Sequence, residues 1–388
     1  MTTTSGTTYQ ICKRCVMDTS DPDIVFDNQG VCNHCHVRDT VLGLGIKDPA
    51  ERERALLEFV EQIKTDGRGK PYDCVIGVSG GVDSTYVAYK VKELGLRPLA
   101  VHLDNGWNSE LAVHNIQKVL QKLDIDLITQ VLDWDEFRDI QLAFLRASTP
   151  DSEIPTDHAI NACVYQTAWK RKIPYVILGT NRATEVTMPR RWSQGHLDWR
   201  YIQAVHQQYG SRPIKTFPHF DLISYIRCQK WSRKHSFTLL DYLDYQKSVA
   251  MDVLQNVLGW EAYGGKHYES IYTRFFQGYI LPTKFGFDKR RAHLSDLVGS
   301  GQLARDEALR QLSEDPYPSE ALKQQDKEYV TKKLGLTADE FEAIMQLPPH
   351  AREEFPYMER TAIYRSVRST YKTIKRMAKA ARKKQPDA

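Results

Sequence analysis

The chain has 388 residues, of which 41% are hydrophobic and 26% are charged, and its formal net charge is +4. These values are typical of a soluble globular protein with two or three domains. No apolar run reaches the roughly 18 residues that a membrane-spanning helix needs. The amino terminus has no basic segment followed by an apolar one, so a secretory signal is not expected. We therefore expect a cytoplasmic protein.

Positive charge is concentrated at the carboxyl end of the chain. Residues 360–388 hold ten Lys or Arg and one acid, Asp387, which leaves a formal charge of −5 on the remainder. A nucleic-acid-binding surface needs basic residues spread over one face, so the acidic body argues against a nucleic-acid partner. From Ile363 to Ala381 the apolar spacing predicts an amphipathic basic helix.

Four of the seven cysteines form two pairs near the amino terminus. Cys12 and Cys15 are separated by two residues, and so are Cys32 and Cys35. This spacing is typical of two knuckles that bind a structural Zn²⁺ through four thiolates and leave no open coordination position. Disulfides and an iron–sulfur centre are the alternatives, and a reducing compartment disfavours disulfides. Residues 1–45 are therefore predicted to form a zinc ribbon.

The middle of the chain alternates between helical and strand patterns. A helix is predicted over 49–64, and strands are predicted over 74–78, 99–104, 127–132 and 175–179. Strands that alternate with helices of 10–15 residues imply a parallel sheet with helices on both faces. Ligands of such sheets bind beyond the carboxyl ends of the strands. We therefore predict an α/β domain over 46–212.

The last part of the chain lacks strand patterns after residue 212. Residues 235–259 are predicted to be helical, with Gly259 as the helix stop, and Thr337 and Glu340 form a capping box for a later helix. We therefore predict a helical carboxyl-terminal domain over 213–388.

A Gly-rich segment follows the first predicted strand and precedes a helix. It consists of Ser79, Gly80, Gly81, Val82, Asp83 and Ser84. A strand–loop–helix turn directs backbone N–H groups and the helix amino terminus to one point, which suits a phosphate. Ser79 and Ser84 add hydroxyl donors, and Asp83, counted here as a catalytic candidate, can hold Mg²⁺ or cap the helix. The spacing is neither that of a Walker loop nor that of a dinucleotide-binding loop. A tight turn that only caps the helix is the alternative.

This segment resembles the S-G-G-x-D-S signature of the PP-loop ATP pyrophosphatase superfamily. The resemblance implies a PP-loop fold in which the loop binds the pyrophosphate end of ATP, with Mg²⁺, and AMP is joined to a substrate oxygen. It also implies positions beside ATP after the second and fourth strands, for which ordinary strand-end turns are the alternative. These positions are Asp104, Asn105, Gly179, Thr180 and Asn181.

Further segments resemble one branch of that superfamily. They are ICKRCVMD and CNHC of the cysteine pairs, SGGVDST, YGGKHYES (263–270), TRFFQGYILPTKFGFDKRRAHLS (273–295) and SGQLARDEAL (300–309). Over residues 12–310 the chain is similar to the N-acetyl sugar amidotransferases of surface-polysaccharide and nonulosonic-acid biosynthesis. The resemblance implies conversion of an acetamido group to an acetamidino group. Chemically, adenylation of the amide oxygen makes AMP the leaving group for attack by ammonia.

Such a reaction needs positive charge near the separating pyrophosphate. We expect Lys284 and Arg290 to contact phosphate and Asp288 to orient them. A solvated, charged helix start is the alternative for Lys284, and for Lys289 it is the preferred interpretation.

The reaction also needs a base for a proton of the incoming nitrogen. Glu185 and His267 are the first candidates, followed by Asp157 and His158. A lone histidine or glutamate is more often a structural polar residue, which is the alternative for each of them.

Two tryptophans lie among arginines in the segment 188–200. Aromatic faces beside guanidinium groups would suit an anionic sugar or its nucleotide carrier. An ordinary surface loop with partly buried tryptophans is an equal alternative. The residues are Trp192, Trp199, Arg190, Arg191 and Arg200.

The nitrogen source is expected to be external. Residue 2 is Thr, and neither Cys74, Cys163 nor Cys228 lies in a G-x-C-x-G elbow, so the chain is not expected to hydrolyse glutamine. Ammonia would come from solution or from a separate glutaminase that delivers it by a channel, with a cyclase-like subunit, as the resemblance also suggests. The basic terminal helix could dock that partner or simply pack on its own domain.

Two other functions are compatible with parts of the sequence. A tRNA thiolation enzyme of the same superfamily would need further cysteines near its site, and Cys163 is the only plausible one. A zinc-ribbon scaffold with an inactive nucleotide loop is the second, and the intact Ser79, Asp83 and Ser84 count against it.

Overall fold

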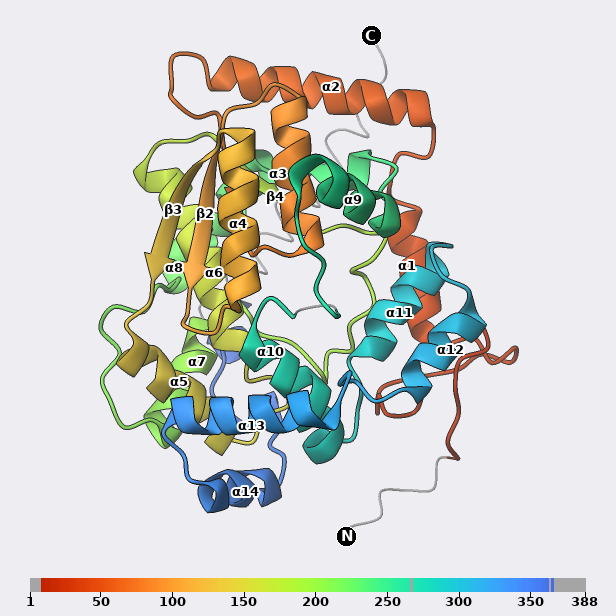
Figure 1. The fold of residues 1–388 in the computed structure, drawn as a ribbon, viewed down its shortest axis with the longest axis vertical. Helices are drawn as coiled ribbons and strands as arrows, with labels where there is room; N and C mark the ends of the chain where they lie inside the picture. The colour runs from red at the N-terminus through yellow and green to blue at the C-terminus, as the bar shows by residue number, and fades with distance from the viewer. Residues whose placement is uncertain (1–7, 266–267, 363, 366–388) are drawn as a thin grey trace.

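The computed structural model describes residues 8–265, 268–362 and 364–365. At its centre lies a five-stranded sheet with the order β3-β2-β1-β4-β5, in which every neighbouring pair of strands is parallel (Figure 1). The strands are β1 (Cys74–Gly77), β2 (Pro98–Asp104), β3 (Asp126–Val131), β4 (Tyr175–Leu178) and β5 (Ser236–Thr238). The first four confirm the strands predicted from the sequence.

The fifth strand replaces the start of a predicted helix. Residues 236–238 pair with β4, and a 3₁₀ turn, η1 (Leu239–Tyr242), follows them. The chain becomes helical again in α9 (Lys247–Val253) and the π-helical η2 (Leu254–Leu258), which ends at Gly259 with a φ of 69°. The helix prediction for 235–259 was therefore wrong over its first half, and the sheet extends beyond the predicted boundary at residue 212.

Helices cover both faces of the sheet because successive strand side chains point to opposite sides. Ile76 of β1 lies in one apolar cluster with Val60 and Val87, whereas its neighbour Val75 lies in the other apolar cluster. The first face carries α2 (Pro49–Asp66), α3 (Val82–Glu93) and α4 (Glu110–Leu123). The other face carries α6 (Ile154–Lys170) and α8 (Leu222–His235), and α7 (Trp199–Tyr209) and α5 (Trp134–Arg146) pack behind α6. The result is a three-layer α/β/α arrangement.

The carboxyl-terminal part is helical, as predicted. Its elements are α10 (Ile271–Phe275), the π-helical η3 (Phe276–Phe285), α11 (Arg290–Gly299), α12 (Arg305–Ser313), α13 (Glu320–Leu334), α14 (Ala338–Gln346), η4 (Arg352–Glu354) and η5 (Met358–Arg360). The capping box of Thr337 and Glu340 begins α14. The predicted basic helix lies outside the described residues from residue 366 onward. None of the helices that the structure describes is long and apolar enough to span a bilayer.

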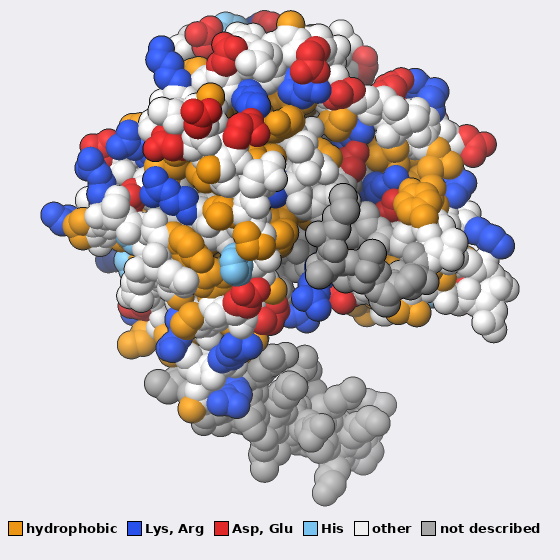
Figure 2. Space-filling view, turned by 90° about the horizontal axis from the view of Figure 1, so that it is seen from below, with side chains coloured by type: hydrophobic (Ala, Val, Ile, Leu, Met, Phe, Trp, Pro, Cys, Tyr) orange, Lys and Arg blue, Asp and Glu red, His pale blue; other side chains and the backbone are white. Residues whose placement is uncertain are grey.

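A short bridge attaches this helical part to the sheet. Asn108, just after β2, forms an isolated antiparallel bridge with Ser270. The backbone N–H of Ser109 donates to the Glu269 carbonyl at 2.8 Å, and that of Ile271 donates to the Trp107 carbonyl at 2.9 Å. The bridge brings the start of α10 to the carboxyl end of β2. On the face shown in Figure 2, acidic and basic side chains of the described residues are interspersed with apolar ones.

Candidate active site and metal centre

A cavity of about 820 Å³ opens at the carboxyl ends of β1, β2 and β4. β1 lies between β2 on one side and β4 on the other, so the cavity lies where the strand order reverses direction. Ligands of open α/β sheets bind at this position. The walls come from the loop 79–84, the start of α6, the segment 185–196, α10 with η3, and the residues around the start of α11.

The Gly-rich loop forms one wall of the cavity. Gly80 has a φ of +83°, a left-handed conformation that glycine adopts without steric cost. Its carbonyl accepts hydrogen bonds from Trp260 Nε1 at 2.8 Å and from the Tyr263 hydroxyl at 3.1 Å. Ser84 Oγ accepts a bond from the Ser79 backbone N–H at 3.3 Å. The loop is thus held from both sides in one conformation.

The amino terminus of α3 lies at this cavity, where Glu269 Oε1 approaches the residue Gly81. Its N-cap is Gly81, and no side chain of the described residues caps it. The first backbone N–H groups of a helix have no partners inside the helix, and together with the helix dipole they favour an anion. Because Gly81 and Ser84 line the cavity, the geometry suits a phosphate group, as predicted from the sequence.

Asp83 lies in the first turn of α3 and lines the cavity. The hydroxyl of Tyr245 donates a hydrogen bond to its Oδ1 atom. Burial, with the negative charge of Asp83 added, raises the pKa of Tyr245, so Tyr245 remains a donor at any physiological pH. Asp83 does not cap the helix, and its role as a Mg²⁺ ligand, which its carboxylate oxygens would suit, stays a prediction.

The predicted strand-end positions divide into two groups. Asn105, Gly179 and Thr180 line the cavity. Asp104 is not among the lining residues, and its carboxylate accepts bonds from the Gly106 N–H at 2.9 Å and from Asn108 Nδ2 at 3.3 Å. Asn181 is also not a lining residue and accepts a bond from the Thr184 N–H at 2.8 Å. Asp104 and Asn181 therefore bond within their strand-end turns, and a contact of either with ATP stays a prediction.

Lys284 does not lie at the cavity, so the predicted phosphate contact is wrong. Its Nζ atom donates to three carbonyls at the carboxyl end of α14, at 2.7, 3.1 and 2.7 Å, which are those of Ile344, Met345 and Leu347. The last carbonyls of a helix have no partners inside the helix, so a lysine there satisfies them. Burial lowers the pKa of Lys284 to about 8.

Arg290 also lies away from the cavity. The phosphate contact predicted for it is therefore wrong. Asp288 does orient it, since its Oδ2 atom lies 2.7 Å from Arg290 Nη2. The guanidinium then donates to the carbonyls of Gln311 at 3.1 Å and Glu314 at 2.9 Å, at the end of α12. Arg290 therefore joins the start of α11 to the end of α12.

Lys289, which was expected to be solvated, lines the cavity, as does Lys247. Its side chain is only 12% exposed, and its Nζ atom lies 3.5 Å from Glu153 Oε2. Burial lowers the pKa of Lys289, but the carboxylates of Glu153, Asp151 and Asp157 outweigh burial and raise it. Lys289 is therefore charged and paired within the wall.

Beside this ion pair, His196 lies among carboxylates. Its Nε2 atom is 3.5 Å from Asp151 Oδ2, 3.4 Å from Asp157 Oδ2 and 2.8 Å from Ser193 Oγ. Burial lowers the pKa of His196, but the hydrogen bond with Asp151 and the charge of Asp157 raise it to about 9. His196 and Asp157 line the cavity, and His196 has no signal in the sequence that would identify it.

The other base candidates have different positions. Glu185 lies at the rim and lines the cavity. His158 is buried, with a 2.9 Å bond between its Nδ1 atom and the His196 carbonyl, and its Nε2 atom accepts from the Phe220 N–H at 3.0 Å. Burial lowers its pKa to about 4, so His158 is a structural histidine. His267 lies outside the described residues.

The tryptophans of the segment 188–200 are packing residues. Trp192 is buried and stacks on Phe287 with ring centroids 4.6 Å apart, and Trp199 stacks on His219 at 4.1 Å. Neither lines the cavity. They anchor the segment that carries Ser193 and His196 into the wall.

Cys163 lines the cavity but is only 5% exposed. Burial raises the pKa of its thiol to about 12, so it is protonated at neutral pH. A sulfur carrier needs an accessible thiolate, and Cys163 is better described as a small apolar wall residue.

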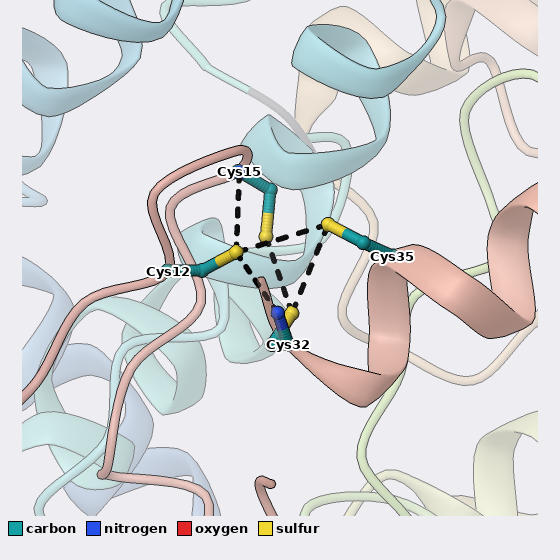
Figure 3. Close-up of side chains that lie close together, drawn as sticks. All are labelled: Cys12, Cys15, Cys32 and Cys35. Carbon is teal, nitrogen blue, oxygen red and sulfur yellow. Dashed lines mark hydrogen bonds between the residues drawn. The ribbon is translucent and has the colours of Figure 1, made fainter. Parts of the chain in front are cut away.

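The four amino-terminal cysteines converge on one point (Figure 3). Their Sγ atoms lie within 4.8 Å of one another, with separations of 3.8, 3.6 and 3.8 Å for three of the pairs. A tetrahedral Zn²⁺ with Zn–S bonds of about 2.3 Å separates its sulfurs by roughly 3.8 Å, so the geometry fits a structural zinc. The sulfurs are too far apart for disulfides, which need about 2.05 Å. His34 and His36 pair instead with Asp21 and Asp27.

The cysteine module docks on α11 and α12, which lie beside α1 (Asn33–Leu42) in Figure 1. Arg305 donates to the carbonyls of Cys12 at 2.8 Å and Cys15 at 3.0 Å. Arg38 donates to the Ser295 carbonyl at 2.7 Å. The next residue, Asp296, is buried and accepts from the N–H groups of 186 and 187 in the cavity wall. α11 thus connects the metal centre to the cavity.

The chain is similar to one family model and to several solved structures. Residues 269–371 match the family model described as "LPS biosynthesis protein WbpG-like, C-terminal domain". This range begins at Glu269 on the bridge and includes Lys289. A search of curated proteins found no match.

Among solved structures, the chain is similar to an NMN synthetase from Francisella tularensis, with 15% identity and a TM-score of 0.31, covering 72% of this chain and 97% of that chain. It is also similar to an NH3-dependent NAD synthetase from Campylobacter jejuni, with 16% identity and a TM-score of 0.28, covering 55% of this chain and 94% of that chain. Both TM-scores are low, so the fold assignment rests on the sheet order described above.

Proposed function

We propose that the chain is an ATP-dependent amidotransferase of lipopolysaccharide biosynthesis. It would adenylate the acetamido oxygen of an N-acetyl sugar, either nucleotide-linked or a nonulosonic acid, and replace AMP by ammonia to give an acetamidino sugar. The observation that carries this proposal is the cavity, which is lined both by the SGGVDS loop and by polar residues of the WbpG-like segment.

The residues of the cavity suit the first step. The amide oxygen attacks the α-phosphorus of ATP, and pyrophosphate leaves. The N–H groups at the start of α3 and the hydroxyls of Ser79 and Ser84 would hold the leaving pyrophosphate, and Asp83 would hold Mg²⁺. Mg²⁺ would neutralise phosphate charge when bound.

The opposite wall suits a sugar. It carries hydrogen-bonding side chains that would suit ring hydroxyls and an acetamido group, namely those of Thr156, Asn161, Thr273 and Gln277. Ammonia would come from solution or from a separate glutaminase with a channel-forming, cyclase-like subunit. ATP and the activated sugar place the reaction in the cytoplasm.

The reaction can be tested directly. The zinc-loaded protein is incubated with ATP, Mg²⁺ and concentrated ammonium, with a panel of free and nucleotide-linked acetamido sugars, and all products are followed by mass spectrometry. The expected result is AMP formed in step with a sugar in which one oxygen has become NH. If AMP forms only with bulk tRNA and sulfide, the chain is a thiolation enzyme and the proposal is wrong. An inactive Ser84→Ala variant would tie the turnover to the loop.

A further inference from the structure

Asp83, Glu185 and Glu269 line other parts of the cavity. Around Lys289 and His196, three neighbouring carboxylates, Asp151, Glu153 and Asp157, differ in their partners. Asp151 is buried, and its Oδ2 atom accepts a bond from Ser193 Oγ at 2.5 Å and contacts His196. Glu153 is buried, accepts a bond from Gln277 Nε2 at 2.8 Å and pairs with Lys289. Both carboxylates are therefore committed to the architecture of the wall.

Asp157 is different because it opens on the cavity. Its side chain is 47% exposed, and it lies in the first turn of α6, beside the carboxyl ends of the strands. The Nε2 atom of His196 lies 3.4 Å from the Oδ2 atom of Asp157 and 3.5 Å from the Oδ2 atom of Asp151. Asp157 is therefore a carboxylate with one side supported by an imidazole and the other facing the space where a substrate would lie.

The charge of this wall suits the chemistry of the second step. Asp151, Glu153 and Asp157 face His196 and Lys289, which gives a formal charge of −1 when all five groups are ionised. An amide is neutral, whereas attack by ammonia creates a positively charged nitrogen and the product is an amidinium. A wall with excess negative charge stabilises a positive charge that develops during the reaction.

We propose that Asp157 is the catalytic base of the amination step, with His196 as its positioning residue. This inference rests on the proposed function. The lone pair of ammonia attacks the carbon of the adenylated imidate, and the new C–N bond gives a tetrahedral centre that carries an NH₃⁺ group. Asp157 takes one proton from that group. The C–O bond then breaks, AMP leaves with the electron pair, and the amidinium remains.

Burial and the charge of Asp151 raise the pKa of Asp157. This makes it a stronger proton acceptor than an ordinary carboxylate while the imidazolium of His196 keeps it ionised. Lys289 acts on the same wall by neutralising Glu153.

The experiment separates the two half-reactions. Sugar-dependent exchange of labelled pyrophosphate into ATP, measured without ammonium, reports adenylation alone, and amidine formation with saturating ammonium reports both steps. The variant is Asp157→Asn. The control is Asp135→Asn, because Asp135 is also an aspartate in the first turn of a helix but pairs on the surface with Arg212. Both variants lose the same helix-dipole interaction.

We expect Asp157→Asn to lower amidine formation by about 100-fold or more, as is typical of a lost general base, and to leave pyrophosphate exchange within about threefold of the wild type. Retained exchange also shows that the variant is folded. Asp135→Asn should leave both rates unchanged. Equal losses of exchange and amination in Asp157→Asn, or an unchanged amination rate, would overturn the inference.

His196 is tested by the pH profile of amination. His196→Asn removes the positive charge beside Asp157, so the pH at which the rate falls on the acidic side should move upward. An unchanged profile would remove His196 from the mechanism. If the wild-type chain shows no exchange with any acetamido sugar, the proposed function itself fails, which is a different outcome from failure of the variant alone.

Discussion

Lys289 and Glu153 form an ion pair in the cavity wall, with 3.5 Å between Nζ and Oε2. The next residue, Arg290, turns away and joins two helices. Of these two adjacent basic side chains, Lys289 therefore neutralises a carboxylate at the cavity, whereas Arg290 joins α11 to α12.

Lys289→Met should lower the free energy of unfolding by about 3 kcal/mol, because it leaves Glu153 without its counter-charge, and it should raise the KM for the sugar. Arg290→Met should also destabilise the chain, because three carbonyl and carboxylate contacts are lost, but should leave kcat/KM for ATP unchanged. Urea unfolding and steady-state kinetics check both. If Arg290→Met raised the KM for ATP by more than about tenfold, this result would support the phosphate contact that the sequence predicted for Arg290.

Gly80→Ala should abolish most ATP use. An added Cβ would lie 3.0 Å from the Ala112 carbonyl oxygen and 3.0 Å from the Tyr263 hydroxyl, at a φ of +83°. Gly69→Ala is the matched control, since Gly69 has a φ of +77° with open space around it. Both should lose about 1 kcal/mol of stability from the left-handed backbone, and only Gly80→Ala should lose pyrophosphate exchange, by tenfold or more. Equal activity in the two variants would contradict the role of the loop.

One Zn²⁺ per chain is expected in elemental analysis. Cys15→Ser should lose the metal and lower the Tm, because structural zinc contributes directly to folding free energy. Cys228→Ser is the control, since Cys228 is buried in α8 outside the cluster, and it should keep one Zn²⁺. Iron with visible absorbance in place of zinc would show that the cluster is an iron–sulfur centre.

The stability of the chain should decrease between pH 6.5 and 9 through His196. Its folded pKa is about 9 and its unfolded pKa about 6.5, so the folded state binds the extra proton. The stabilisation is complete below pH 6.5 and disappears as the pH rises through 9. Because 35% of the side chain is exposed, screening by water reduces it to the order of 1 kcal/mol. Urea unfolding of His196→Asn should lack this slope, and an identical slope in both proteins would contradict the assignment.

The sequence was most informative where the signal was local. Apolar runs predicted β1, β2 and β4, because strands buried on both faces are largely apolar. The segment LITQVL predicted β3, although this edge strand is largely exposed. The spacing of the cysteines predicted a geometry that fits zinc. β5 was missed because three residues, of which only Phe237 is buried, are too short to show a pattern and the sheet, not the segment, determines their conformation.

The basic residues show why the rest of the site could not be predicted. In the segment TKFGFDKRR, Lys284, Lys289 and Arg290 are equivalent by composition. Their functions depend on partners distant in the sequence, which are the end of α14, Glu153 and the end of α12 respectively. The position of Asp157 at the ligand-binding edge could be predicted from the sequence order. A helix that leads into a parallel strand begins at the carboxyl end of the sheet, and Asp157 lies in the first turn of the helix that precedes the fourth strand.

The contacts between Arg305 and the carbonyls of Cys12 and Cys15 join residues that are synthesised far apart in time. The cysteine pairs leave the ribosome early, but the helices on which they dock, α11 and α12, emerge only after about three quarters of the chain has been made. Closing so long a loop is entropically costly and slow. We therefore expect the metal module to remain undocked until α11 and α12 have been synthesised. The wall that α11 contributes to the cavity forms at the same stage, so completion of the cavity is expected late in the synthesis of this protein.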